Sequence, residues 1–330
     1  MTLIPAEWSP HRSMWLGFPS HGELWEDNLE PAQDEVAALA AALAGPGGER
    51  VRLMVCGDEA EAAARKRLGD VAGVEFVRGL FGDIWLRDTG PIFDAEGAAH
   101  GFRFNGWGGK YELEGDDQVA VQIAAAAGAP LRTHDFILEG GALDHDGYGT
   151  VLTTRQCLLN PNRNPGWTRE DAEAALAEGL GARKVLWLGE GLQRDHTDGH
   201  VDNLARFVAP GVVTCPVGFG KADPNADVYD ETARMLAGMT DARGAPITVM
   251  RIPSPGWTED AEGEMVPASH MNFILANGAV ICPIYGEGAG EFALAALRSL
   301  FPERQVIGLP SRAILTGGGS FHCITQQVPA

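Results

Sequence analysis

The order of predicted secondary-structure elements repeats along the chain, and this repeat restricts the possible folds more than any other feature. The clearest copy contains two strands, a helix and a third strand, expected over Asn272–Ala276, Ala279–Ile284, 289–300 and Gln305–Leu309. Between the first two strands lies Asn277-Gly278, a pair typical of a tight hairpin turn. The expected helix has its apolar side chains weighted to one face: Phe292, Leu294, Ala295, Leu297 and Leu300.

The same order can be traced in other parts of the chain. One copy has strands near 203–208 and 211–216, a helix near 227–239 and a strand near 247–252, another covers 149–188, a fourth runs from about 90 to 135, and a degenerate fifth opens the sequence. Units that cannot each bury their own faces favour a closed, radial array over a row of domains. No Pro/Ser-rich linker divides the chain, so residues 1–330 are predicted to form one α/β domain.

The charge balance indicates which partners the chain would meet. With 25 basic and 45 acidic residues, the net charge is −20. A field of this sign repels nucleic acid and anionic membranes and favours cations. The simpler interpretation is solubility. We therefore expect a small cationic partner, no nucleic acid and no membrane, and we leave open a homo-oligomer.

Cysteine usage and hydropathy indicate the compartment. The five cysteines are widely spaced and include no Cys-x-x-Cys pair, which argues against a disulfide framework and against a cysteine-type zinc site. The first residues lack the basic start and apolar run of a signal peptide, and no uncharged stretch is long enough to span a bilayer. A cytoplasmic location is expected.

Polar clusters come just before the first strand of successive units. They are Asp83–Pro91, Glu139–Gly141, Asp195–Asp202, Ser269-His270 and Gly317–Cys323. In a radial repeat, equivalent positions converge near the axis, so residues far apart in sequence would share one pocket.

Such a pocket has the parts of a thiol hydrolase. Cys323 supplies a nucleophile, His200 can transfer protons near neutral pH, and Glu139 can orient that imidazole. Asp88 and Asp202 are surplus to this chemistry, because additional carboxylates disfavour a thiolate unless the substrate is itself a cation.

A guanidinium group fits this requirement, since its forked N–H donors bind carboxylates bidentately. Trp85 and Trp107 would wall the site and stack on the cation, and Gly317–Gly319 would allow close backbone approach. No cofactor and no metal are expected. The rival interpretation is a metal-dependent amidohydrolase that uses His196 and His200, although the Gly and Asp content around them favours a loop over a helix.

The motifs resemble those of the agmatine deiminases, in the family that also contains the Porphyromonas-type peptidylarginine deiminase. The similarity covers essentially the whole chain, in the segments Pro5–His11, Trp85–Pro91, Asn105–Tyr111, Leu138–Gly141, Cys157–Pro165, Thr197–Asp202, Asn277–Val280 and Gly317–Gln327.

This resemblance implies a five-bladed, pseudo-symmetric α/β propeller, a pentein, around a central active-site channel. It implies Cys323 as nucleophile, His200 as general acid/base with Glu139 as its partner, and Asp88 and Asp202 as guanidinium ligands. The implied reaction converts agmatine and water to N-carbamoylputrescine and ammonia through a covalent thiouronium, in putrescine biosynthesis or agmatine breakdown. Deimination of free or peptidyl arginine is the close alternative, for which Arg87, Arg103 and Arg163 are candidate ligands of a substrate carboxylate. A silent polyamine-binding protein is a further alternative.

Overall fold

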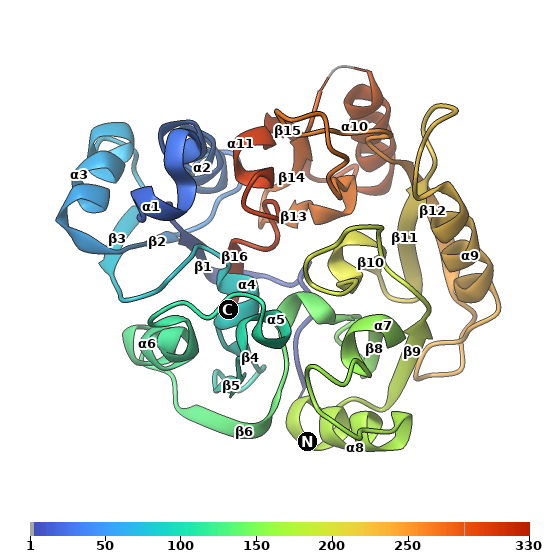
Figure 1. Cartoon of the computed structure of the whole chain (residues 1–330). Coiled ribbons are helices and arrows are strands. Elements are labelled where there is room, and N and C mark those ends of the chain that lie inside the picture. Colours follow the sequence, from blue (N-terminus) through green and yellow to red (C-terminus); the bar gives the residue numbers. More distant parts are fainter. Residues whose placement is uncertain (1–2, 287) are drawn as a thin grey trace.

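The computed structural model describes residues 3–286 and 288–330, and its strands form five separate small sheets. Figure 1 shows these sheets arranged around a common centre, with the longer helices on the outside. In each sheet a strand pairs antiparallel with its neighbour, which in turn pairs parallel with the next. The architecture is therefore the predicted five-bladed α/β propeller.

Four blades follow the strand, strand, helix, strand order directly. The second and third blades consist of β4 (Ile92–Phe93), β5 (Ala99–Arg103), α6 (Val119–Ala127) and β6 (Leu131–Ile137), then β7 (Asp144–His145), β8 (Thr150–Thr154), α8 (Arg169–Leu180) and β9 (Lys184–Leu188). The fourth and fifth consist of β10 (Arg206–Ala209), β11 (Val212–Val217), α9 (Ala226–Ala237) and β12 (Thr248–Pro253), then β13 (Ile274–Leu275), β14 (Ala279–Ile284), α10 (Ala289–Leu300) and β15 (Gln305–Pro310).

The first blade combines strands from distant parts of the sequence. Its chain order is β1 (His11–Gly17), α1 (Gly22–Trp25), η1 (Glu26–Asn28), α2 (Leu29–Ala44), β2 (Val51–Val55), α3 (Gly57–Leu68) and β3 (Val74–Arg78). The missing antiparallel strand is β16 (Thr325–Pro329), which pairs with β1 so that Leu16 lies opposite Thr325. This unit looked degenerate in the sequence because its first strand is supplied from the far end of the chain.

A short helical turn precedes the first strand of each of the other blades. These turns are α4 (Leu86–Thr89), η3 (Gly140–Ala142), η4 (Val201–Asn203) and η5 (His270–Asn272), and the remaining short segments are α5 (Gly106–Gly109), η2 (Asp116–Gln118), α7 (Arg155–Leu158) and α11 (Arg312–Leu315). The predicted polar clusters fall on or beside these turns and on the turn before β16. Their equivalent places in the repeat bring them toward the axis.

Two details of the predicted fifth unit are wrong. The first strand, expected over Asn272–Ala276, is shortened to β13, because the polar Ser269 caps the turn η5 by accepting a hydrogen bond from the N–H of Met271 at 3.1 Å. Phe292 and Ala295 do not share the buried face of the helix with Leu294 and Leu297, because Phe292 is 60% exposed and Ala295 is exposed as well. The buried face of α10 instead follows Gly290, Ala293, Leu294 and Leu297, since successive residues are rotated by about 100°.

Apolar packing explains why the blades stay together. The Ala-rich helices α2 and α6 both bury their apolar faces in one core cluster with β1 and β2. Cys323 belongs to the same cluster. Within residues 3–286 and 288–330, no helix has the length and apolarity needed to cross a bilayer.

Candidate active site

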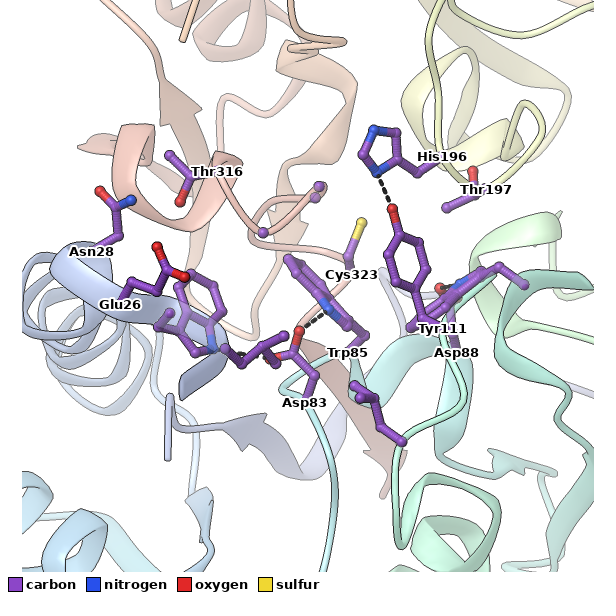
Figure 2. Close-up of a pocket in the computed structure, with 17 residues that line it drawn as sticks. Glu26, Asn28, Asp83, Trp85, Asp88, Tyr111, His196, Thr197, Thr316 and Cys323 are labelled. Carbon is purple, nitrogen blue, oxygen red and sulfur yellow. Dashed lines mark hydrogen bonds between the residues drawn. The ribbon is translucent and has the colours of Figure 1, made fainter. Parts of the chain in front are cut away.

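A cavity of about 270 Å³ is lined in part by Cys323. Its walls include the rings of Trp25, Trp85 and Trp107. In the view of Figure 2, Glu26, Asn28 and Asp83 lie on one side of Cys323, whereas Asp88, Tyr111 and His196 lie on the other. The predicted nucleophile and both predicted tryptophans therefore line one cavity.

The glycine loop before Cys323 allows the close approach that the sequence predicted. A Cβ atom on Gly319 would lie 2.6 Å from the Cζ3 atom of Trp85 and 3.2 Å from the Cβ of Cys323. Any side chain at this position would displace the indole or the nucleophile. The glycine therefore sets the distance between the cavity wall and the sulfur atom.

Asp88 lies in α4 and is held by donors from two other segments. Its Oδ1 accepts a hydrogen bond from the N–H of Gly141 at 2.9 Å, and its Oδ2 accepts one from Nε1 of Trp107 at 2.9 Å. Trp107 has φ 54°, in the left-handed region that a tryptophan rarely adopts. Trp107 therefore lines the cavity and also holds the carboxylate of Asp88 by a hydrogen bond.

Asp202 lies in η4, behind Cys323 and outside the described cavity lining. Its Oδ2 is 3.7 Å from Sγ of Cys323 and 2.8 Å from Nδ1 of His322. Burial alone would raise the pKa of Asp202, but the bond from His322 holds the pKa below its ordinary value. Asp202 is therefore ionised at neutral pH, and its Oδ1 is buried with no hydrogen-bond partner among the described residues.

Burial and the carboxylates of Asp202 and Asp88 raise the pKa of the Cys323 thiol well above its ordinary value. Two contacts act in the opposite direction: a hydrogen bond from the backbone of Ser320, and one from Nδ2 of Asn272, which donates to the sulfur at 3.2 Å. The resting residue is therefore a thiol, and a cation placed between the two carboxylates would favour the thiolate.

His200 is fully buried next to Asp88, whose Oδ2 lies 3.7 Å from its Nδ1. Burial by itself lowers the pKa of His200, but Asp88, Cys157 and Glu139 raise it well above its ordinary value. A Cβ on Gly141 would lie 2.6 Å from the same Nδ1, 2.8 Å from Oδ1 of Asp88 and 3.2 Å from Oδ2 of Asp202. Gly141 thus lies where three of the predicted site residues meet.

Glu139 occupies the position predicted for the partner of His200, but its nearest hydrogen bond goes elsewhere. Its Oε1 accepts from Nε of Arg163 at 2.5 Å. A carboxylate oxygen of Glu139 lies within 4.8 Å of a ring nitrogen of His200. In the described part of the chain, neither ring nitrogen of His200 has a hydrogen-bond partner.

The two histidines of the rival metal interpretation lie in different surroundings. His196 is at the cavity wall, where its Nδ1 is 2.9 Å from the hydroxyl of Tyr111, whereas His200 is buried. The segment between them is a turn, as its composition predicted. Among the described residues, the three-residue cluster with metal-ligand geometry is Glu139, Cys157 and His200, without His196.

Several residues of the site have contacts that could not be predicted from the sequence. Asn272 holds the sulfur, Asp83 lines the cavity, and His322 bridges Asp202 to Glu7 through its Nε2 at 3.0 Å. The position of Asn272 before the first strand of a unit was the signal that could have identified it.

Comparison with known proteins agrees with this geometry. A family model described as Porphyromonas-type peptidyl-arginine deiminase matches residues 3–329. The chain is 40% identical over 354 positions to an agmatine deiminase of Ectopseudomonas mendocina, with 99% of this chain and 95% of the relative covered.

Solved structures show the same relationship. An agmatine deiminase of Enterococcus faecalis, described as catalysing its reaction, matches with a TM-score of 0.92 and 31% identity, over 99% of this chain and 96% of that one. An agmatine deiminase of C. jejuni with substrate bound matches with a TM-score of 0.89 and 28% identity, over the same shares. The resemblance inferred from the motifs is thereby confirmed, and the chain belongs to the Porphyromonas-type peptidyl-arginine deiminase family.

Proposed function

We propose that this chain is an agmatine deiminase that hydrolyses agmatine to N-carbamoylputrescine and ammonia, with Cys323 as nucleophile. The observation that carries the choice of substrate is the charge of the cavity. Among the described residues that line it, Glu26, Asp83 and Asp88 carry carboxyl groups, and none is a lysine or arginine. Burial raises the pKa of Asp83 to about 7 and that of Asp88 above its ordinary value, so a bound cation would favour their ionised forms. Agmatine carries a cation at each end and no carboxylate, so it complements this surface.

The candidate ligands for a substrate carboxylate lie elsewhere. Arg163 is buried against Glu139, and Arg87 is buried with its Nη1 donating to Gln327 at 2.8 Å. Arg103 is at the surface, where it pairs with Asp135. This distribution disfavours free arginine and a C-terminal arginine as substrates.

The proposed reaction begins when Asp88 and Asp202 bind the guanidinium and its positive charge favours the thiolate of Cys323. The sulfur attacks the central carbon, and His200 as imidazolium gives its proton to an amino group. The carbon–nitrogen bond then breaks, releasing ammonia and leaving a thiouronium on Cys323.

The neutral His200 next takes a proton from a water molecule that attacks the same carbon. Collapse of this second adduct breaks the carbon–sulfur bond, returns the thiolate, passes the proton of the added hydroxyl to solvent and releases the carbamoyl product. Glu139 supports the imidazolium through its charge, and Trp85 and Trp107 flank the substrate.

Ammonia release from agmatine, free arginine and a peptidyl arginine, measured side by side, tests the proposal. We expect kcat/KM for agmatine to exceed that for arginine at least about 100-fold, because arginine would bring a carboxylate against an acidic wall. Cys323→Ala should abolish turnover without loss of fold. Faster release from either arginine substrate would refute the assignment, and loss of activity in excess EDTA would favour the metal-dependent alternative.

A further inference from the structure

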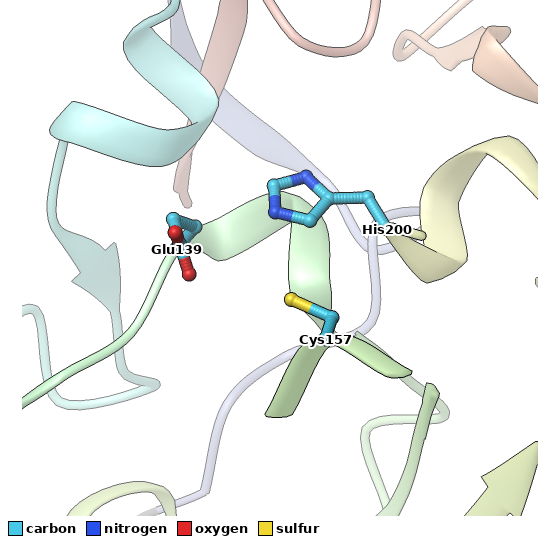
Figure 3. A group of neighbouring side chains, drawn as sticks. All are labelled: Glu139, Cys157 and His200. Atoms are coloured by element: carbon cyan, nitrogen blue, oxygen red, sulfur yellow. The ribbon is translucent and has the colours of Figure 1, made fainter. Parts of the chain in front are cut away.

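A second buried cysteine lies beside the general acid/base and has no role in the reaction described above. Sγ of Cys157, a carboxylate oxygen of Glu139 and a ring nitrogen of His200 all lie within 4.8 Å of one another. Figure 3 shows the sulfur of Cys157 directed toward the imidazole. Cys157 and Glu139 are each 1% exposed and His200 is 0% exposed.

The backbone fixes the position of this thiol relative to His200. Thr154 caps the short helix α7, and its Oγ1 accepts a hydrogen bond from the N–H of Cys157 at 3.2 Å. The same hydroxyl donates to the carbonyl of Gly199 at 2.6 Å. One side chain thus connects Cys157 to the residue immediately before His200.

A metal ion is a poor occupant of this cluster, although thiol, imidazole and carboxylate groups are typical zinc ligands. The guanidinium of Arg163 already lies 2.5 Å from Oε1 of Glu139 and is 2% exposed. A divalent cation would have to bind beside this buried positive charge. The negative charge of Glu139 is instead balanced within the protein.

His200 must change its protonation state twice in each proposed turnover, and most groups facing it are charged. Asp88 faces it from α4, Glu139 from the start of η3 with Arg163 behind it, and Asp202 lies in its own turn. Carboxylates stabilise the imidazolium and cannot donate to the neutral ring. A thiol is both a weak donor and a weak acceptor, so it can contact either form. Its contribution raises the pKa of His200, so it favours the imidazolium over the neutral ring.

We propose that Cys157 is a positioning residue for His200, whose thiol contacts the imidazole in both of its protonation states. The role rests on the proposed function of His200 as general acid/base. Burial raises the pKa of Cys157, so the residue remains a thiol throughout. Cys157 and His200 are both absent from the described cavity lining, and the sulfur acts on the reaction through the imidazole that it faces.

Valine and serine form a matched pair for the kinetic test. Cys157→Val fills the space without hydrogen bonding, whereas Cys157→Ser keeps a donor and an acceptor. We expect kcat for agmatine to fall about tenfold in the valine variant, with KM unchanged within about twofold, and to recover partly in the serine variant. The alkaline limb of the pH profile should move to lower pH in the valine variant, because the sulfur no longer supports the imidazolium.

The titration of the His200 ring by NMR tests the same contact without turnover. Cys323→Ala is the background, with and without Cys157→Val, and the pKa of His200 should fall by about half a unit or more when the thiol is removed. An unchanged titration would overturn the proposal whatever the substrate proves to be. Equal kinetic loss in both variants with an unmoved alkaline limb would also overturn it, since that pattern indicates a packing role. If the valine variant does not fold, Cys157→Ala takes its place.

Discussion

The carboxylate of Asp202 should control how readily the Cys323 thiol ionises. Its Oδ2 lies 3.7 Å from Sγ, and both groups are buried. At an effective dielectric constant of about 20, two unit charges at this distance repel by about 4 kcal/mol, equivalent to about three pKa units. The imidazole of His322 shares the same oxygen and offsets part of the field. We therefore expect Asp202→Asn to lower the pKa of Cys323 by about one to three units.

Alkylation by iodoacetamide across a pH series, followed by mass spectrometry of the peptide that contains Cys323, measures this pKa directly. At pH 8 the alkylation rate should rise at least about tenfold in Asp202→Asn, because more of the sulfur is thiolate. Glu26→Gln is the matched control, since it removes a carboxylate from the cavity that Cys323 lines, and Glu26 is not among the main causes of the raised pKa of Cys323. An equal or higher pKa in Asp202→Asn would refute the electrostatic argument.

Two further changes test the packing and the ion pairs of the site. Gly141→Ala should reduce kcat/KM at least about 100-fold without unfolding the protein, because the added Cβ would lie 2.6 Å from Nδ1 of His200. The control is Gly189→Ala, whose added Cβ would have nothing within 4 Å, so its kcat/KM should match that of the wild type. Arg163→Met should lower the free energy of unfolding in urea by about 3 to 5 kcal/mol, because it leaves the carboxylate of Glu139 buried without its partner. A loss below about 1 kcal/mol would show that the pair contributes little.

The propeller could be predicted because its blades leave local signals. The Asn277-Gly278 turn, the apolar strand Ala279–Ile284 and the helix 289–300 appear in the structure within the predicted bounds. A strand of two residues such as β7 leaves no such pattern, because alternation needs several residues to be visible, and the bounds of β13 were predicted too wide for the same reason. The pairing of β16 with β1 likewise depends on tertiary contacts alone.

The candidate site was predictable to the extent that its residues repeat with the blades. Asp88, Glu139, Asp202 and Cys323 each lie on or beside the turn that precedes a first strand, and their acidic or nucleophilic character made them conspicuous. Cys157 follows the second strand of its blade, so the repeat gave no reason to place it near the axis. Its motif was visible in the sequence, but its contact with His200 required the three-dimensional structure.

The pairing that completes the first blade has a consequence for folding. Until β16 arrives, β1 presents an unpaired edge that carries Met14, Trp15 and Leu16, all fully buried in the finished sheet. An apolar edge of this kind can pair with the same segment of another molecule, and pairing partners from opposite ends of a chain meet late. We therefore expect chains that lack residues 325–329 to aggregate during refolding. The strand that follows the nucleophile thus also protects the folding chain from self-association.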